Sequence, residues 1–329
     1  MIHILLCPHV LDYGGAQLGV LHWAKHLDKS RFKVTILAMG KGGLSSQFES
    51  VFSVFYDDID YPNILEFIKK IKPDILHACP PGGKSIEYIT KAAGLVPVTQ
   101  TSMCPRVVGN KGDVSGSVVI SEYVLSLQED VEDAVCIDLP LDVSGYEIKY
   151  TKEYFGLPEN KLIIGSLGNE RKENAHFMKI ARNFKNKDVH FAIKTNEKFK
   201  YFFGRDKITV INRYLDEDEK LSFFNCLDVF LYPTSNEAYG LVFLEAMSQK
   251  VPIISYEDTA MPEVISKGGV LAPLNDINRL MLILEDLVKS KDKRKRLGQF
   301  GYDLFRNRNS PEVIAKKYET FFNNILRKG

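Results

Sequence analysis

The sequence has few of the features that mark membrane, secreted or nucleic-acid-binding proteins. Its 329 residues contain no apolar run of the ~18 residues needed to cross a bilayer. The net charge of +1 does not favour nucleic acid as a partner. The first residues, MIHILLC, are apolar but short and lack a basic leader, so they predict a first strand and not a signal peptide. We therefore expect a cytoplasmic protein, with the inner face of a membrane as the alternative location.

Motifs for metals, disulfides and nicotinamide cofactors are also missing. The five cysteines are scattered and form no C-x-x-C pair, which indicates reduced thiols and no zinc site. No Asp-x-Asp motif lies directly at the end of a predicted strand, and the nearest acidic cluster, Asp57-Asp58-Ile59-Asp60, is interpreted as a loop, so we expect no metal. We expect no other cofactor either. No G-x-G-x-x-G motif follows the first predicted strand, and no acidic residue ends the second, which argues against a dinucleotide site.

Apolar runs of strand length alternate with amphipathic helical stretches along almost the whole chain. In the first part the predicted strands are residues 2–7, 33–38, 51–55, 74–77, 96–101 and 117–120. In the second part they are residues 162–167, 189–194, 208–211, 228–232, 252–256 and 269–272. Continuously apolar strands joined by helices indicate parallel sheets covered on both faces. We expect an α/β chain of two Rossmann-like, doubly wound domains facing an interdomain cleft, where the strands' carboxyl ends would bind a ligand.

The alternation pauses once, in residues 137–150, which we interpret as the linker between the two domains. The sequence thus predicts an N-terminal domain over residues 1–142 and a C-terminal domain over residues 143–309. Residues 310–329 are predicted to form a last helix, because Pro311 after Ser310 suits a helix start. We expect this helix to pack back on the N-terminal domain.

The segment 235–247 is the most informative part of the sequence. An apolar strand runs into Pro233 and a polar turn with Glu237, and a helix that opens at about Gly240 carries Glu245 one turn later. A helix N-terminus attracts anions, above all phosphate. Two carboxylates would repel a bare phosphate, but they accept hydrogen bonds from hydroxyls. Phosphate together with hydroxyls suggests a nucleotide sugar. The alternative is that both glutamates are surface carboxylates without a ligand, because the helix dipole stabilises carboxylates near a helix start.

A second loop, after the first strand of the C-terminal domain, combines glycines with cations. Gly165 and Gly168 are followed by Arg171 and Lys172. Glycines followed by cations at a strand end suit a diphosphate, with each charge-assisted contact contributing roughly 1.5–3 kcal/mol. The alternative is a solvated basic pair, which is disfavoured because a helix start is the wrong end for cations unless an anion is bound.

A third loop follows the first strand of the chain and contains Gly14 and Gly15. Glycines let the backbone approach a ligand closely, and the helix that follows offers N–H groups to an anion. The alternative, a tight turn between a strand and a helix, is equally compatible with this pattern.

These segments resemble a known family over most of the chain. Residues 236–247 resemble the E-x7-E signature of retaining GT-B glycosyltransferases of the GT4 type (glycosyl transferases group 1). Further segments similar to the family's motifs are Val251-Pro-Ile-Ile254, Met261-Pro-Glu263, Tyr13-Gly-Gly-Ala16, Pro73-Asp-Ile-Leu-His77 and Val118-Val-Ile-Ser-Glu122. The resemblance implies a GT-B fold and a metal-independent, hexosyltransferase-type enzyme.

The implied reaction moves a sugar from a UDP- or GDP-sugar to a hydroxyl of a glycan or lipid-linked acceptor, with retention, in glycan, polysaccharide or glycolipid synthesis. Asn169 stands where the family has an arginine, and residues 100–106 lack the family's histidine. These departures motivate the first alternative, a catalytically weak or inactive nucleotide-sugar-binding protein. A GT-B sugar epimerase or phosphorylase is a third class.

The resemblance also implies roles for individual residues. Glu237, Lys172 and Arg171 would be the catalytic residues, with Glu237 on a hydroxyl of the donor sugar and the two cations on the diphosphate. Glu245 would accept hydrogen bonds from the ribose hydroxyls. The other implied nucleotide-sugar-binding residues are Ala238, Tyr239, Gly240, Leu241, Gly14, Gly15, Gly168, Asn169, Arg213 and Tyr214. Arg213 and Tyr214 would flank the base.

A basic run, residues 289–296, is the one feature that favours a weak peripheral contact with a membrane. Its lysines and arginines suit anionic lipid headgroups. The alternative, a solvated junction between two helices, is the more common origin of such a run.

Overall fold

The computed structural model describes the chain except for residues 81–85, 104–111, 129–133, 169–170, 197–206 and 329, and except for the side chains of residues 171–173 and 328. The chain divides into two compact units. The first comprises Met1–Asp142 and Arg308–Gly329, and the second comprises Val143–Asn307. No helix among the described residues is long and apolar enough to span a membrane.

The N-terminal unit is a seven-stranded sheet in the order β3-β2-β1-β4-β5-β6-β7, and every neighbouring pair is parallel. Its strands are β1 (Ile2–Cys7), β2 (Phe32–Ala38), β3 (Ser53–Tyr56), β4 (Ile75–Ala78), β5 (Val98–Ser102), β6 (Gly116–Val119) and β7 (Ala134–Cys136). Its helices are α1 (Gly15–Ala24), α2 (Ser45–Val51), α3 (Ile64–Ile71), α4 (Glu87–Ala93), α5 (Glu122–Ser126) and α12 (Pro311–Lys328). The central strands β1 and β4 are almost wholly buried, which fits their apolar sequences.

The C-terminal unit is a six-stranded parallel sheet in the order β10-β9-β8-β11-β12-β13. Its strands are β8 (Leu162–Leu167), β9 (Val189–Lys194), β10 (Ile208–Ile211), β11 (Val229–Leu231), β12 (Ile253–Glu257) and β13 (Gly269–Pro273). Its helices are α6 (Arg171–Asn183), α7 (Glu217–Asn225), α8 (Leu241–Ser248), α9 (Met261–Ile265), α10 (Ile277–Lys289) and α11 (Lys291–Leu304), with a 3-10 turn η1 (Ser266–Gly268). A π-helical segment η2 (Phe305–Asn309) follows α11.

The predicted fold class is confirmed, since each unit is a parallel sheet with helical crossovers. Two local predictions were wrong. Val51 ends helix α2 and does not begin a strand, because the chain stays helical until the Phe52 amide bonds to the Phe48 carbonyl. Strand β7 was not predicted, because its three residues lie at the sheet edge and Val135 is exposed, so they show no continuous apolar run.

Each sheet has a point where the order of its strands reverses. Strand β1 lies between β2 and β4, and strand β8 lies between β9 and β11. In doubly wound sheets, ligands bind beyond the carboxyl ends of the strands at this reversal. In the C-terminal unit that place is where β8 and β11 end, and these two strands precede the loop at Gly168 and the turn at Glu237.

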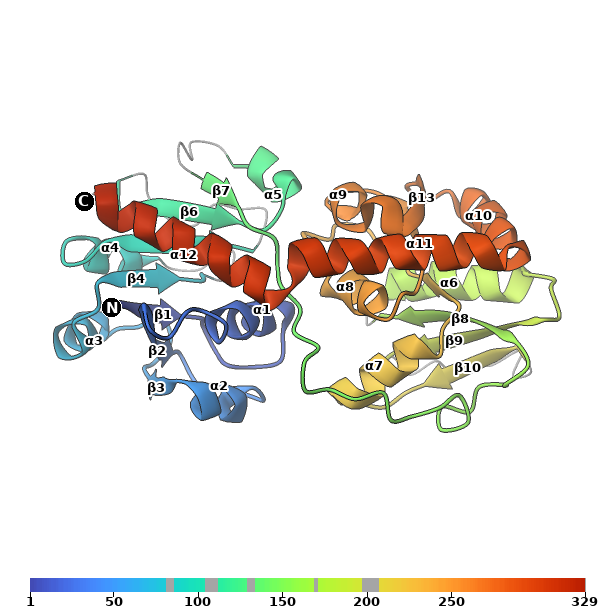
Figure 1. Cartoon of the computed structure of the whole chain (residues 1–329), viewed down its shortest axis with the longest axis horizontal. Coiled ribbons are helices and arrows are strands. Elements are labelled where there is room, and N and C mark those ends of the chain that lie inside the picture. The colour runs from blue at the N-terminus through green and yellow to red at the C-terminus, as the bar shows by residue number, and fades with distance from the viewer. Residues whose placement is uncertain (81–85, 104–111, 129–133, 169–170, 197–206, 329) are drawn as a thin grey trace. The chain divides into compact units, whose positions relative to one another are not determined.

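Helix α12 completes the N-terminal unit although it comes from the far end of the chain. It packs against α1 over the N-terminal sheet (Figure 1). The Tyr318 ring stacks on Trp23 with a centroid distance of 4.0 Å and an interplanar angle of 11°. The Tyr318 hydroxyl lies 3.0 Å from the Thr101 hydroxyl on β5, and the Thr101 hydroxyl lies 2.9 Å from Nε2 of His77 on β4. Burial lowers the pKa of His77 to about 3, so the imidazole is neutral in this core.

Helix α11 lies along α8 within the C-terminal unit (Figure 1). The approach is closest at Gly298, where a Cβ atom would lie 1.9 Å from the carbonyl oxygen of Lys250, just after α8. Only glycine fits there, because a backbone atom fixed by its own helix end cannot move aside.

Gly298→Ala is therefore expected to reduce the free energy of unfolding by about 3 kcal/mol, the upper range for overpacking. Chemical denaturation measures this change. The matched control is Gly301→Ala on the same helix, where the added Cβ would lie 3.1 Å from the flexible Met247 side chain. A loss in Gly298→Ala no greater than in Gly301→Ala would contradict this packing argument.

Candidate functional site

The turn between β11 and α8 has a tightly constrained backbone. Gly240 precedes α8 with φ of 82°, and a Cβ there would lie 2.7 Å from the Phe243 ring. Asn236 also has a positive φ, of 63°, and its amide donates to Asp258 Oδ2 at 3.0 Å. The N-cap residue of α8 is Gly240, which has no side chain to cap the helix. The turn therefore presents the first amides of α8, the kind of group that binds an anion.

Glu245 is buried in the middle of α8, with 6% of its surface exposed. Its Oε1 lies 2.7 Å from Nζ of Lys220, and Lys220 Nζ also lies 2.9 Å from Glu217. Burial by itself would lower the pKa of Lys220, but the two carboxylates outweigh it and raise that pKa. Burial raises the pKa of Glu217 against the opposing effect of Lys220. Glu245 is thus held in place by a charged lysine from α7.

Glu237 lies half-buried in the turn before α8. Its carbonyl oxygen accepts a hydrogen bond of 3.4 Å from the amide of Ala260, which follows β12. Glu237 and Glu245 therefore come from one strand-turn-helix segment at the carboxyl edge of the C-terminal sheet. Ala238, Tyr239 and Leu241 belong to the same segment, with Tyr239 buried.

The glycine loop after β8 reaches the same edge of the sheet. A Cβ on Gly168 would lie 2.9 Å from the ring of Tyr232, the residue that follows β11. Asn169 lies outside the described residues. Arg171 and Lys172 form the first turn of α6, and their side chains lie outside the described part of the chain. The structure thus brings Gly168 beside the β11 turn, and the contacts of Asn169, Arg171 and Lys172 stay predictions.

Arg213 and Tyr214 follow β10 and belong to a separate network. The Arg213 guanidinium lies 2.6 Å from Glu219 Oε1, donates to the Tyr214 carbonyl at 3.1 Å, and sits 5.3 Å from the Tyr154 ring centroid. Arg213 borders a cavity of about 220 Å³ between β10 and the 154–155 segment. Tyr214 is 59% exposed. No recorded contact in the described chain joins either residue to Glu245, so their role beside a base stays a prediction.

Gly14 and Gly15 lie at the carboxyl end of β1 in the N-terminal unit. Gly14 is the N-cap residue of α1 and likewise has no side chain to cap its helix. Asp12 Oδ1 fixes the loop by accepting from the Tyr13 amide at 2.8 Å and the Gly43 amide at 3.3 Å. This unit therefore also presents an uncapped helix start at its sheet reversal.

Three charged residues that were not predicted lie near the β11 turn: Lys194, Glu217 and Lys220. Lys220 and Glu217 flank Glu245 from α7. Lys194 ends β9 and is 8% exposed. The sequence signal for Lys194 was its place at the end of a mostly apolar strand, VHFAIK. A lysine in such a strand is buried, and a buried charged residue rarely lacks a partner. The other two could not be found, since only the fold brings α7 beside α8.

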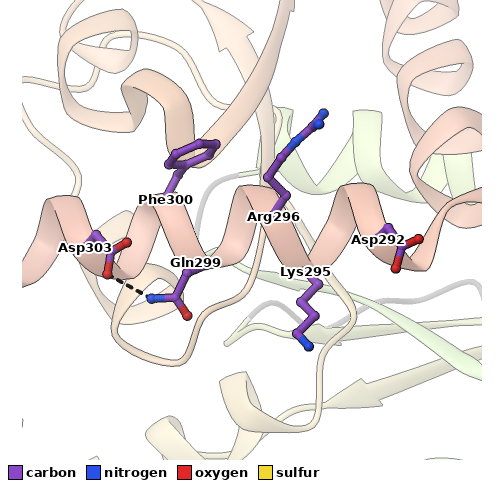
Figure 2. A pocket seen from close by; sticks show the side chains of 6 residues that line it. All are labelled: Asp292, Lys295, Arg296, Gln299, Phe300 and Asp303. Carbon is purple, nitrogen blue, oxygen red and sulfur yellow. Dashed lines mark hydrogen bonds between the residues drawn. The ribbon is translucent and has the colours of Figure 1, made fainter.

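A different hollow, of about 380 Å³, lies on the surface of α11 (Figure 2). Its lining residues are Asp292, Lys295, Arg296, Gln299, Phe300 and Asp303. The two acidic and two basic side chains balance each other, and Gln299 donates to Asp303 at 2.8 Å. This surface has no net charge with which to select an anion, and it is separate from the turn between β11 and α8. No cluster of three metal-binding side chains occurs among the described residues.

Comparison with known proteins gives a family match and structures of the same fold. Residues 203–304 match the family model "Glycosyl transferases group 1", and this range includes α7, the β11 turn and α8. The chain is 27% identical over 191 residues to the O-antigen biosynthesis glycosyltransferase WclY of Escherichia coli, a match that covers 54% of this chain and 51% of WclY. The chain thus spans about half the length of that curated relative.

Two solved structures have the same fold over nearly their full length. A glycosyltransferase from Rickettsia africae has a TM-score of 0.83 at 17% identity, covering 100% of this chain and 99% of that one. Anabaena HepE, solved in complex with UDP-glucose, has a TM-score of 0.75 at 13% identity, covering 98% and 100%. The C-terminal unit thus matches glycosyl transferases group 1 over residues 203–304, and the chain has the GT-B fold of two parallel-sheet α/β domains.

Proposed function

We propose that the protein is a retaining glycosyltransferase of the GT4 type that moves a hexose from a UDP- or GDP-sugar to a hydroxyl of a glycan or lipid-linked acceptor. The observation that carries this proposal is the buried Glu245 beside the uncapped start of α8, at the sheet reversal and inside the family match. The WclY relative and the HepE complex support a role in polysaccharide synthesis and a nucleotide-sugar donor.

Glu245 would hold the ribose of the donor nucleotide. Lys220 contacts Oε1 of Glu245, which leaves Oε2 to accept from a ribose hydroxyl. Lys220 orients the carboxylate, and its charge is already balanced by Glu217 and Glu245. Glu237, earlier in the same turn, would accept from a hydroxyl of the donor sugar. Arg213 and Tyr214 would flank the base.

The diphosphate would lie against the start of α8 and the β8 loop. The bond between the anomeric carbon and the diphosphate oxygen breaks, the acceptor oxygen bonds to the same face of that carbon, and the acceptor proton passes to the departing diphosphate. Amides of residues 238–241, with Gly168, Asn169, Arg171 and Lys172, would stabilise the charge on that diphosphate without a metal. Neither glutamate needs to act as a nucleophile.

The N-terminal domain, residues 1–142, would bind the acceptor, and Gly14 and Gly15 would approach the diphosphate from that domain. The C-terminal domain, residues 143–309, would bind the donor. We place the protein in the cytoplasm or at the inner face of a membrane, where the basic run 289–296 would make a weak contact with anionic lipid. Liposome flotation tests this last point.

A thermal-shift screen with nucleoside diphosphates and their sugars tests the proposed donor site, because a ligand of the native state raises its melting temperature. Transfer of labelled sugar to a glycan or lipid-linked acceptor, with stereochemistry read by NMR, tests the activity. The specific observation that favours a catalytically weak binding protein is Asn169 in place of the family's arginine. A melting shift without transfer or donor hydrolysis would favour that alternative. A product with inverted stereochemistry would refute retention. No melting shift with any nucleotide would refute both the glycosyltransferase and the nucleotide-sugar-binding protein.

Lys172→Ala is expected to lower kcat about tenfold, the lower range for loss of a charge-assisted contact, because the adjacent Arg171 keeps part of the positive charge at the start of α6. Single-turnover transfer with saturating donor measures the change. Lys179→Ala, later on the same helix, is the matched control and should leave kcat unchanged. An unchanged kcat in Lys172→Ala would remove Lys172 from the diphosphate site.

A further inference from the structure

Lys194 is a buried lysine at the carboxyl edge of the C-terminal sheet. It is the last residue of β9, whose six residues are all buried, and only 8% of its surface is exposed. Strand β9 pairs with β8, with Leu167 opposite Lys194, and the Gly168 amide donates to the Lys194 carbonyl at 3.2 Å. Lys194 thus lies directly beside the glycine loop at which the diphosphate is expected.

The Lys194 ammonium has a neutral partner. Its Nζ donates to Oδ1 of Asn196 at 2.9 Å, and no ion pair with a carboxylate is recorded for it in the described part of the chain. Lys220, by contrast, contacts both Glu217 and Glu245. A buried ammonium is normally paired with an anion, because removing it from water is costly. Within the described part of the chain, the surroundings of Lys194 therefore lack one negative charge.

The neighbouring charges indicate where an anion would lie. Burial, and next the repulsion from Lys220, lower the pKa of Lys194, so the two ammonium groups are close enough to affect each other. Lys220 in turn holds Glu245, the residue proposed for the ribose. Lys194 therefore has the expected diphosphate loop on one side and the expected ribose site on the other. In a nucleoside diphosphate, the group between these two is the phosphate attached to the ribose.

We propose that Lys194 binds the diphosphate of the donor nucleotide, at the phosphate next to the ribose. This inference rests on the proposed function, since it takes a nucleoside diphosphate as the ligand. An ammonium group suits this place because it carries three donors and no acceptor, and a charge-assisted bond to phosphate compensates its burial. Lys194 is then a binding residue that lies outside the family match of residues 203–304 and outside the glycine loop.

The test compares a nucleoside diphosphate with its nucleoside by calorimetry, using UDP with uridine and GDP with guanosine. Lys194→Met keeps an unbranched side chain that is one atom shorter and removes the charge. We expect the affinity for the diphosphate that the native chain binds to fall about 10- to 100-fold, and the affinity for the matching nucleoside to stay within about twofold. Lys194→Arg restores a cation and should recover much of the lost affinity. Lys267→Met, an exposed lysine on η1, is the matched control.

The outcomes distinguish a failure of the proposed function from a failure of the role assigned to Lys194. If the native chain binds neither UDP nor GDP, the proposed function fails. If the native chain binds one of them and Lys194→Met binds it equally well, this inference fails while the proposed function stands. Equal losses for nucleoside and nucleoside diphosphate would mean that Lys194 supports the ribose or base site, which also overturns it. If Lys194→Met does not fold, Lys194→Gln, which keeps a donor toward Asn196, replaces it in the same comparison.

Discussion

Glu245→Gln is expected to lower kcat/KM for sugar transfer about 100-fold and to weaken binding of the free nucleoside diphosphate by a similar factor, the upper range for a charge-assisted hydrogen bond. The amide keeps the volume of the carboxylate. Its NH₂ group, however, cannot accept from a ribose hydroxyl, and its oxygen remains next to Lys220. Calorimetry with UDP and GDP measures the binding, and initial rates measure the transfer.

The fold should survive this substitution, because Lys220 keeps its contact with Glu217 at 2.9 Å. A thermal unfolding curve close to that of the native chain would establish this. Unchanged affinity for the free diphosphate in a folded Glu245→Gln variant would refute the assignment of Glu245 to the ribose.

Glu237→Gln is the matched control, since it changes the other glutamate of the same turn. Glu237 is proposed to contact the sugar, which free UDP and GDP lack. We therefore expect this variant to bind the free diphosphate normally and to transfer sugar more slowly. If Glu237→Gln weakened the free diphosphate as much as Glu245→Gln does, the two roles could not be separated in this way.

Tyr318→Ala is expected to reduce the free energy of unfolding by about 3–5 kcal/mol, the range for removal of a large buried aromatic side chain. Tyr318 is 1% exposed, stacks on Trp23 and lies in the core beneath α12. Its loss would leave a cavity between α1, α12 and the N-terminal sheet, and these elements cannot close it because their backbones are fixed by other contacts. Chemical denaturation, followed by the fluorescence of Trp23, measures the change.

Tyr318→Phe separates packing from hydrogen bonding in the same place. It keeps the stacked ring and removes only the hydroxyl that lies 3.0 Å from Thr101. We expect a loss of about 1 kcal/mol, that of one neutral hydrogen bond. Equal losses in the two variants would show that the hydroxyl, and not the ring, secures α12 to the N-terminal unit.

Much of the fold could be predicted because its signals are local. Strands β1, β8, β9 and β10 have the predicted bounds, since continuous apolar runs depend only on neighbouring residues. The errors lie where local signals are weak. The three residues of β7 form a strand only because they pair with β6, and Val51 remains helical because the Phe48 carbonyl holds the end of α2.

The sequence alone also determined the core of the candidate site. Glu237, Gly240 and Glu245 lie within ten residues of one another, so one strand-turn-helix unit fixes their spacing whatever surrounds it. The family resemblance that rests on this segment is confirmed by the match to glycosyl transferases group 1.

The tertiary structure decided which residues outside that segment complete the site. Strands β8 and β11 are neighbours although β9 and β10 separate them in the chain, and this pairing brings Gly168 against Tyr232. The packing of α7 against α8 places Lys220 on Glu245, and the register of β9 with β8 places Lys194 beside Gly168. Contacts between elements distant in sequence depend on strand order and helix packing, which no local pattern encodes. The pairing of Lys220 with Glu245 and the position of Lys194 beside Gly168 therefore became visible only in the folded chain.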